Sequence, residues 1–256
     1  MNGRTFLAML MRDARVARRN FWPLLLQTLL QPMLFVFIFG RVMVGGGLMP
    51  PEYKSLLLPG IIAISMVLSG VQAVALPLVS EFQFTREIED RLLAPMGERW
   101  LALEKVVAGM AQALAAGLVV IPLAWLIMGP GVEISLAHPL RFAALALLVS
   151  MMASSIGLLL GCSVGQTQIG LMFSLVLAPM LFFGCTYYPW SALAAFPIMQ
   201  KAVLINPLVY ASEGFRAVLA PQHPHLPGAA VAAALILFDA LFLTLGLRQF
   251  VKKAVS

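Results

Sequence analysis

Charged residues are scarce in this chain. Only 11% of its 256 residues are Asp, Glu, Lys or Arg, whereas 61% are hydrophobic. A soluble domain usually carries about 25% charged and roughly 45–50% apolar residues. The mean hydropathy is +0.94. The chain also contains continuous apolar runs of about 20 residues, which are long enough to cross a bilayer as helices. These two features exclude an ordinary soluble fold. Transmembrane β-strands would alternate in hydrophobicity. We therefore predict a single-domain, all-α polytopic membrane protein.

Residues that carry chemistry are also few. Cys162 and Cys185 lie in or beside apolar runs, so they predict no disulfide framework. The residues 161–165 match G-x-S-x-G, a nucleophile pattern that requires a strand–turn–helix context, but they lie at the end of an apolar span. His223-Pro224-His225 lacks the accompanying ligands of a metal site. No phosphate-binding G-x-x-x-x-G-K-[ST] loop occurs, and basic and aromatic residues do not interleave as they do in nucleic-acid binders. We predict no enzyme and no cofactor or metal bound by this chain.

The apolar runs predict six membrane spans and one side for both termini. Under the topology that places the N-terminus in the cytoplasm, twelve Lys and Arg residues lie on that side and five on the other. Cytoplasmic loops carry the excess of basic residues, so both termini are predicted to be cytoplasmic. The first run lacks a small-residue cleavage site and should remain as an anchor. The spans are Phe21–Val44, Leu56–Val79, Val106–Met128, Leu140–Val164, Ile169–Phe183 and Ala229–Leu247.

The segment before the first span, residues 1–20, predicts an amphipathic interfacial helix. At about 100° per residue, its basic residues fall in an arc of roughly 120°, and Phe6, Leu7 and Leu10 lie on the other side. Such a helix lies in the headgroup plane with its basic face towards anionic lipid or a partner. The alternative is a segment that only fixes topology. The basic residues are Arg4, Arg12, Arg15, Arg18 and Arg19.

Small residues recur every four positions in the third and fourth spans. Such stripes let helix backbones approach closely in lipid, so we interpret them as packing surfaces. They are Gly109, Ala113 and Gly117, then Ala153, Gly157, Gly161 and Gly165.

Asp239 is the one carboxylate near the middle of a span. Ionisable groups at that depth are functional candidates. Because no basic residue accompanies it at matching depth, both a structural role and a substrate or proton role stay open.

The connection between the second and third spans concentrates charge. Ten charged residues fall between Ser80 and Lys105. Within it, Phe84, Ile88 and Leu92 recur at four-residue spacing and Pro95 closes the pattern, which predicts an amphipathic helix over 81–95. A solvated loop is the alternative reading.

The segment 184–225 is too polar and proline-rich for a plain span. Its aromatics suit the headgroup level, and a helical stretch follows over Asn206–Leu219. We predict an external interfacial or re-entrant helical hairpin before the last span. The residues singled out in it are Tyr187, Tyr188, Trp190, Pro207, Tyr210, Glu213 and Arg216.

On these residues the chain resembles the permease subunits of ABC-2-type exporters. Four features carry the resemblance over nearly the whole chain: the N-terminal amphipathic helix, the run Arg86-Glu87-Ile88-Glu89-Asp90-Arg91-Leu92-Leu93-Ala94-Pro95, the six-span plan, and the run Asn206-Pro207-Leu208-Val209-Tyr210 followed by Glu213 and Phe215-Arg216. One departure is Arg91, where the family more often has leucine.

The resemblance implies a bacterial inner-membrane exporter subunit that pairs with a second permease copy, identical or paralogous. Two cytoplasmic ATPase subunits would bind ATP and Mg. The 81–95 helix would then be a coupling helix, with Phe84, Ile88 and Leu92 inserted into an ATPase and Arg86, Glu87, Glu89, Asp90 and Arg91 at the rim. The substrate stays open among drugs, lipids and glycans.

Two other classes are considered beside the exporter. A secondary carrier or channel that works without ATP would need more buried charge than the single Asp239, or repeat symmetry between halves, and the sequence indicates neither. A membrane-embedded hydrolase would need a catalytic constellation, which is missing as well.

Overall fold

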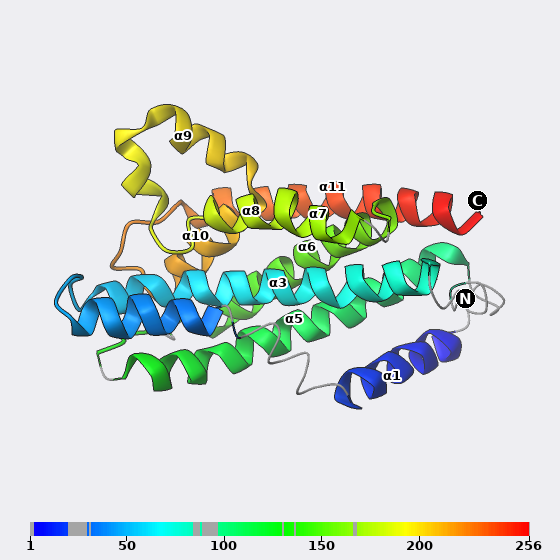
Figure 1. Cartoon of the computed structure of the whole chain (residues 1–256), viewed down its shortest axis with the longest axis horizontal. Helices are drawn as coiled ribbons and strands as arrows, with labels where there is room; N and C mark the ends of the chain where they lie inside the picture. Colours follow the sequence, from blue (N-terminus) through cyan, green and yellow to red (C-terminus); the bar gives the residue numbers. More distant parts are fainter. Residues whose placement is uncertain are drawn as a thin grey trace.

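The computed structural model describes residues 3–19, 30, 32–83, 88, 97–129, 131–135, 137–165 and 168–255. Within these ranges the chain is predominantly helical and contains no strand. The all-α prediction is therefore confirmed for this part of the chain. The helices form an elongated bundle whose long members run side by side (Figure 1).

Among the described residues, four helices are long and apolar enough to cross a membrane. Three of them contain a whole predicted span, and the fourth, Pro139–Ser163, ends one residue before the predicted end at Val164. The second, third, fourth and sixth predicted spans correspond in this order to α3 (Tyr53–Gln83), α5 (Glu98–Met128), α6 (Pro139–Ser163) and α11 (Gly228–Val255).

The other two predicted spans are represented by shorter apolar helices. Part of Phe21–Val44 lies outside the described residues, and its described portion is the helix Pro32–Met43, which contains the π-helix η1 (Val36–Met43). In place of Ile169–Phe183 the chain forms α7 (Ile169–Met172), the π-helical η3 (Phe173–Leu177) and α8 (Ala178–Phe182). Four helices are thus candidate spans by length and composition, and the count of six remains a prediction.

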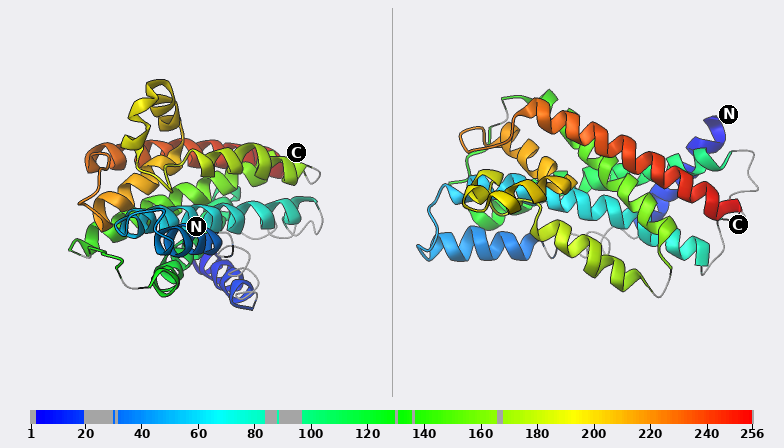
Figure 2. Two further views of the ribbon diagram at one scale, coloured as in Figure 1. Left: turned by 60° about the vertical axis from the view of Figure 1, so that its left-hand side comes forward. Right: turned by 90° about the horizontal axis from the view of Figure 1, so that it is seen from above.

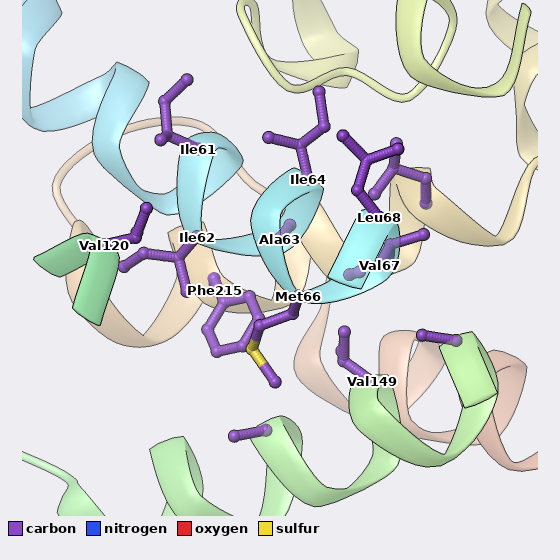
Figure 3. Packing of buried hydrophobic residues seen from close by; sticks show 14 of the residues in the cluster. Ile61, Ile62, Ala63, Ile64, Met66, Val67, Leu68, Val120, Val149 and Phe215 are labelled. Atoms are coloured by element: carbon purple, nitrogen blue, oxygen red, sulfur yellow. The ribbon is translucent and has the colours of Figure 1, made fainter. Parts of the chain in front are cut away.

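Helix α3 lies at the centre of the bundle, packed against α5, α6 and the short helix α10 (Pro207–Leu219). Ile62 and Met66 of α3 converge with Phe215 of α10 in the middle of the apolar core (Figure 3). All three side chains are almost completely buried. Because lipid and the protein core are equally apolar, close packing rather than exclusion from water holds such helices together.

The small-residue stripes of α5 and α6 are packing surfaces, as the sequence predicted, and the structure shows that the helix they contact is α3. The exception is Gly165, which lies beyond the end of α6 and where an added Cβ would meet only Gln168, at 3.8 Å. A Cβ atom added at Gly109, Gly117, Gly157 or Gly161 would come as close as 2.4, 2.7, 2.7 and 3.0 Å, respectively, to an atom of α3. At Gly157 the obstructing atom is the carbonyl oxygen of Val71, which belongs to the main chain and cannot rotate away. Glycine is therefore required for the observed α3–α6 distance.

The ends of the helices follow their local sequence. Helix α5 begins after Gly97, with Glu98 in its first turn. A carboxylate at this position interacts favourably with the positive end of the helix dipole. It ends at Gly129, whose φ of +69° is readily adopted only by glycine. Helix α10 begins with Asn206, whose side chain accepts a 3.0 Å hydrogen bond from the Leu208 N–H, and with Pro207 in the first turn.

The two termini lie at the same end of the bundle, beside helix α1 (Gly3–Arg19) (Figures 1 and 2). The opposite end carries α10 and a projecting group of short helices, η4 (Trp190–Ala195), α9 (Pro197–Ala202) and η5 (Val203–Ile205). This group occupies the segment for which the sequence predicted a helical hairpin. Its depth in the membrane remains a prediction.

Candidate functional sites at the two ends of the bundle

A buried ion pair on α10 organises the end with the projecting helices. Glu213 and Arg216 are one turn apart, both side chains are fully buried, and Arg216 Nη1 donates a hydrogen bond to Glu213 Oε1. The same Oε1 accepts the backbone N–H of Trp190 at 2.8 Å, and Oε2 accepts that of Leu226 at 2.9 Å. Arg216 Nη2 donates to the carbonyl oxygen of Cys185 at 2.9 Å.

The pair therefore joins three chain segments that are distant in sequence: the start of the projecting group, α10, and the loop before α11. Burial lowers the pKa of Arg216, and the adjacent Glu213 carboxylate opposes that effect. An arginine remains protonated in proteins, so its charge needs Glu213 beside it. The sequence singled out both residues, but only the fold shows which backbone groups they bind.

The segment before Trp190 is held in an unusual conformation. Cys185 has a φ of +52°, uncommon for a residue other than glycine, and burial raises the pKa of its thiol to about 12. The backbone of the neighbouring Thr186 packs directly against Gly60 of α3. A Cβ atom added at Gly60 would lie only 1.8 Å from the Thr186 carbonyl oxygen. Tyr53 of α3 donates a 2.7 Å hydrogen bond to the Tyr187 carbonyl. The segment is thus fixed to the central helix.

The remaining predicted residues of this region hold the short helices together. The Tyr188 hydroxyl donates to the Phe182 carbonyl at 3.2 Å, and the Tyr210 hydroxyl to that of Leu204 at 3.0 Å. The Trp190 indole N–H donates to the Gln200 carbonyl at 2.9 Å. All three bonds stay within this end of the bundle. Among the described residues no group of three or more His, Cys, Asp and Glu could hold a metal.

A second polar cluster lies at the end with the termini. Lys105 of α5 donates to Glu81 of α3 at 2.7 Å and to Asp13 of α1 at 2.9 Å, and all three side chains are largely buried. We call Glu81, Lys105 and Asp13 the charged junction. The sequence counted Glu81 and Lys105 among the loop charges without pairing them. The one available signal was that Asp13 is the only acid in α1.

Phe82, next to Glu81, is held by the C-terminal helix. Its ring packs edge-on against Phe250 at a centroid distance of 5.7 Å, and Lys253 Nζ lies 4.9 Å from its centroid. The last turn of α3 is therefore fastened to α1, α5 and α11 together.

The predicted coupling residues are described at one position only. Ile88 is 4% exposed and belongs to the apolar cluster of this chain that includes Leu101 and Phe250. In the structure it packs inside the chain and is not presented at a surface. The other residues of that prediction lie outside the described residues: Phe84, Arg86, Glu87, Glu89, Asp90, Arg91 and Leu92.

The basic face predicted for the N-terminal segment lies on a helix, as expected. Arg12 and Arg15 of α1 are exposed. Arg4, Arg18 and Arg19 belong to the same helix, and their side chains lie outside the description.

Asp239 is 4% exposed on α11, and neither of its oxygens has a hydrogen-bond partner among the described residues. The structure places it inside the bundle and leaves its role open.

Most of this chain matches known proteins in sequence. The family model described as ABC-2 type transporter covers residues 4–220, from α1 through the buried ion pair. The chain is 28% identical over 205 residues to the inner membrane transport permease YadH of Escherichia coli K12, which is 77% of each chain. The YadH proteins of E. coli O157:H7 and Shigella flexneri give the same values. The chain therefore belongs to the ABC-2 type transporter family and is a multi-pass membrane transport permease.

Proposed function

We propose that this chain is the membrane-spanning subunit of an ATP-driven exporter. Two copies would form the translocation pathway, and two separate ATPase subunits would dock at the end that bears both termini. The charged junction is the observation that carries the proposal. Glu81 and Lys105 flank residues 84–96 in the sequence, and Lys105 joins the helices on either side of that segment.

The junction suits the transmission of force. A displacement of residues 84–96 by a soluble partner would act on the last turn of α3 and the first turns of α5 together, because Lys105 ties them. Helix α3 in turn packs against α5, α6 and α10. Motion entering at this point would therefore reach the opposite end of the bundle through packed helices, which are the usual carriers of such coupling.

The distribution of basic residues supports a cytoplasmic location for this end. Lys252 and Lys253 lie in the last turn of α11, and Arg12 and Arg15 are on α1. Positive charge near span ends marks the cytoplasmic side. ATP and Mg would be bound by the partner ATPases, because the sequence contains no phosphate-binding loop.

The second permease copy would complete the pathway. The two shorter apolar helices keep large apolar side chains exposed, among them Phe37, Leu171 and Leu175. These apolar surfaces would suit contact with a second copy of the chain. The cargo would be a drug, a lipid or a glycan, the classes that the resemblance to this exporter family implies.

The test is co-expression and co-purification with candidate ABC ATPases, beginning with any ATPase found to be encoded beside this chain. Leu92→Asp should abolish it, because placing a carboxylate at a buried apolar anchor of an interface costs at least about 2 kcal/mol, or roughly 30-fold in affinity. Leu92 is preferred to Ile88, which packs inside the chain. The mass of the wild-type assembly, two permeases with two ATPases, is measured in the same preparation.

Ile198→Asp is the matched control, since Ile198 is 88% exposed in α9 at the other end of the bundle. It makes the same chemical change and should leave the ATPase bound. Unchanged binding by Leu92→Asp, with a properly inserted chain, would contradict the coupling assignment.

A further inference from the structure

Asp239 lies in the middle of the contact between α6 and α11. The two helices run side by side in the same direction. At one end of the contact Leu145 of α6 and Val231 of α11 both pack on Gly214, and at the other end Gly246 of α11 packs on α6. Asp239 falls about midway between Val231 and Gly246 in the sequence, so it is enclosed by the two helices at mid-length.

The carboxylate of Asp239 is not neutralised from within the chain. It is 4% exposed, neither oxygen has a hydrogen-bond partner among the described residues, and no charged side chain of that part interacts with it. The basic residues of α11 all lie beyond Gly246, towards the end of the helix. A buried carboxylate without a cation is strongly unfavourable. A cation that enters from outside the chain is therefore favoured at this position.

A second group without a partner faces the same contact from α6. Ser155 is completely buried, and its hydroxyl oxygen has no hydrogen-bond partner among the described residues. Ser155 is one turn before Leu158, which packs on Gly246, so it lies on the side of α6 that faces α11. Carboxylate and hydroxyl oxygens both accept hydrogen bonds from the N–H groups of a protonated amine.

Aromatic rings line the flank of α11 beside Asp239. The rings of Phe238 and Phe242 are stacked at a centroid distance of 5.7 Å, and Tyr210 of α10 lies 5.9 Å from Phe238. Phe242 is three residues after Asp239, so the two are neighbours on the helix surface. The rings are only partly buried, and α11 is the least enclosed of the four long helices. The flank therefore gives access to the carboxylate, and ring faces attract cations.

We propose that Asp239 and Ser155, with the two phenylalanine rings of α11, form a binding site for a protonated amine that carries an aromatic or apolar body. The carboxylate neutralises the ammonium group and accepts its N–H, and the rings hold the body. This inference rests on the proposed function, because it narrows the cargo to lipophilic organic cations. A neutral glycan or an anionic lipid carries no cation to pair with Asp239.

The test is equilibrium dialysis of the purified full chain in detergent, with protein-free micelles subtracted. The probes are 1-naphthylmethylammonium and the neutral alcohol of the same shape, 1-naphthylmethanol. We expect wild type to prefer the ammonium about 10- to 100-fold, since a hydrogen bond to a charged group contributes that much affinity. Asp239→Asn should abolish the preference and leave binding of the alcohol unchanged. Phe242→Leu should weaken ammonium binding about 2- to 30-fold.

Two matched controls make the same chemical changes at exposed positions. Glu133→Gln removes one negative charge, and Phe182→Leu removes a ring that is 63% exposed. Both should bind the ammonium as wild type does. Thermal unfolding of each variant shows that it is folded, and Asp239→Leu replaces Asp239→Asn if the amide destabilises the chain.

Equal preference in wild type and Asp239→Asn, or no preference in wild type, would overturn the proposal. An equal loss in Glu133→Gln would show a general charge effect and overturn it as well. The assay needs no ATPase. A chain that prefers the ammonium but recruits no ATPase would lose the exporter assignment and keep the site, whereas a chain that recruits ATPase without the preference would lose the site alone.

Discussion

Replacing Glu213 by Gln tests whether the buried ion pair holds the end of the bundle together. The substitution keeps the shape of the side chain and removes its charge, so Arg216 stays buried without a counter-charge. One carboxylate oxygen also becomes an NH2 group, which then faces a backbone N–H, that of Trp190 or that of Leu226. Two donors facing each other cannot form a hydrogen bond.

The expected cost is large. Removing one partner of a buried ion pair usually costs about 3–5 kcal/mol. For a chain of this size, one kcal/mol shifts the melting temperature by about 2–4 °C, so Glu213→Gln should lower it by roughly 6–20 °C. The assay is thermal unfolding of the purified chain in detergent, followed by proteolysis across residues 184–206 to show whether that segment is released first.

Two further variants separate the ion pair from general damage. Glu133→Gln makes the same change at an exposed position and should leave the melting temperature unaltered. Glu213→Gln combined with Arg216→Met removes the uncompensated charge and should recover part of the lost stability. A double variant as unstable as Glu213→Gln, or no shift in the single variant, would refute the reasoning.

Two more predictions concern the packing of the helices. Lys105→Met leaves the carboxylates of the charged junction without their shared cation, at a cost of about 3 kcal/mol. Hydrogen exchange over residues 3–19 should accelerate roughly 100-fold. The control Lys201→Met, at an exposed site, should leave that exchange rate unchanged. Equal exchange rates in the two variants would disprove the docking of α1 through Lys105. Gly157→Ala places a methyl group 2.7 Å from a carbonyl oxygen of α3 and should destabilise the chain by about 1–3 kcal/mol in thermal unfolding. Gly170→Ala, with open space around it, is the control, and equal stability of the two variants would contradict the α3–α6 contact.

The sequence predicted the long elements well, for a physical reason. A helix that crosses a bilayer must satisfy its backbone internally and present apolar side chains on every exposed face, so its composition alone identifies it. α3, α5, α6 and α11 were found in this way. The stripe through Gly157 and Gly161 was also legible, because close backbone approach requires small residues at four-residue spacing.

The shorter apolar helices and the polar clusters could not be predicted from the sequence to the same degree. η1 and η3 depart from α-helical spacing, and a periodicity argument built on 3.6 residues per turn does not detect that change. Lys105 lies 92 residues from Asp13, a distance over which no local pattern operates. Ile88 was read as a residue for a partner, since an apolar ridge has the same spacing whether it faces another chain or its own core.

The sequence by itself therefore indicated that this is a membrane protein, which helices are candidate spans, and the family to which the chain belongs. Only the tertiary structure decided which polar groups meet. It placed Arg216 against Glu213 and Cys185, joined Asp13 to Lys105, and turned one face of α1 towards the bundle. The reason is that apolarity marks a span but not its inward side, because lipid and protein interior are alike in this respect. The partners of the few charges are set by how the helices pack.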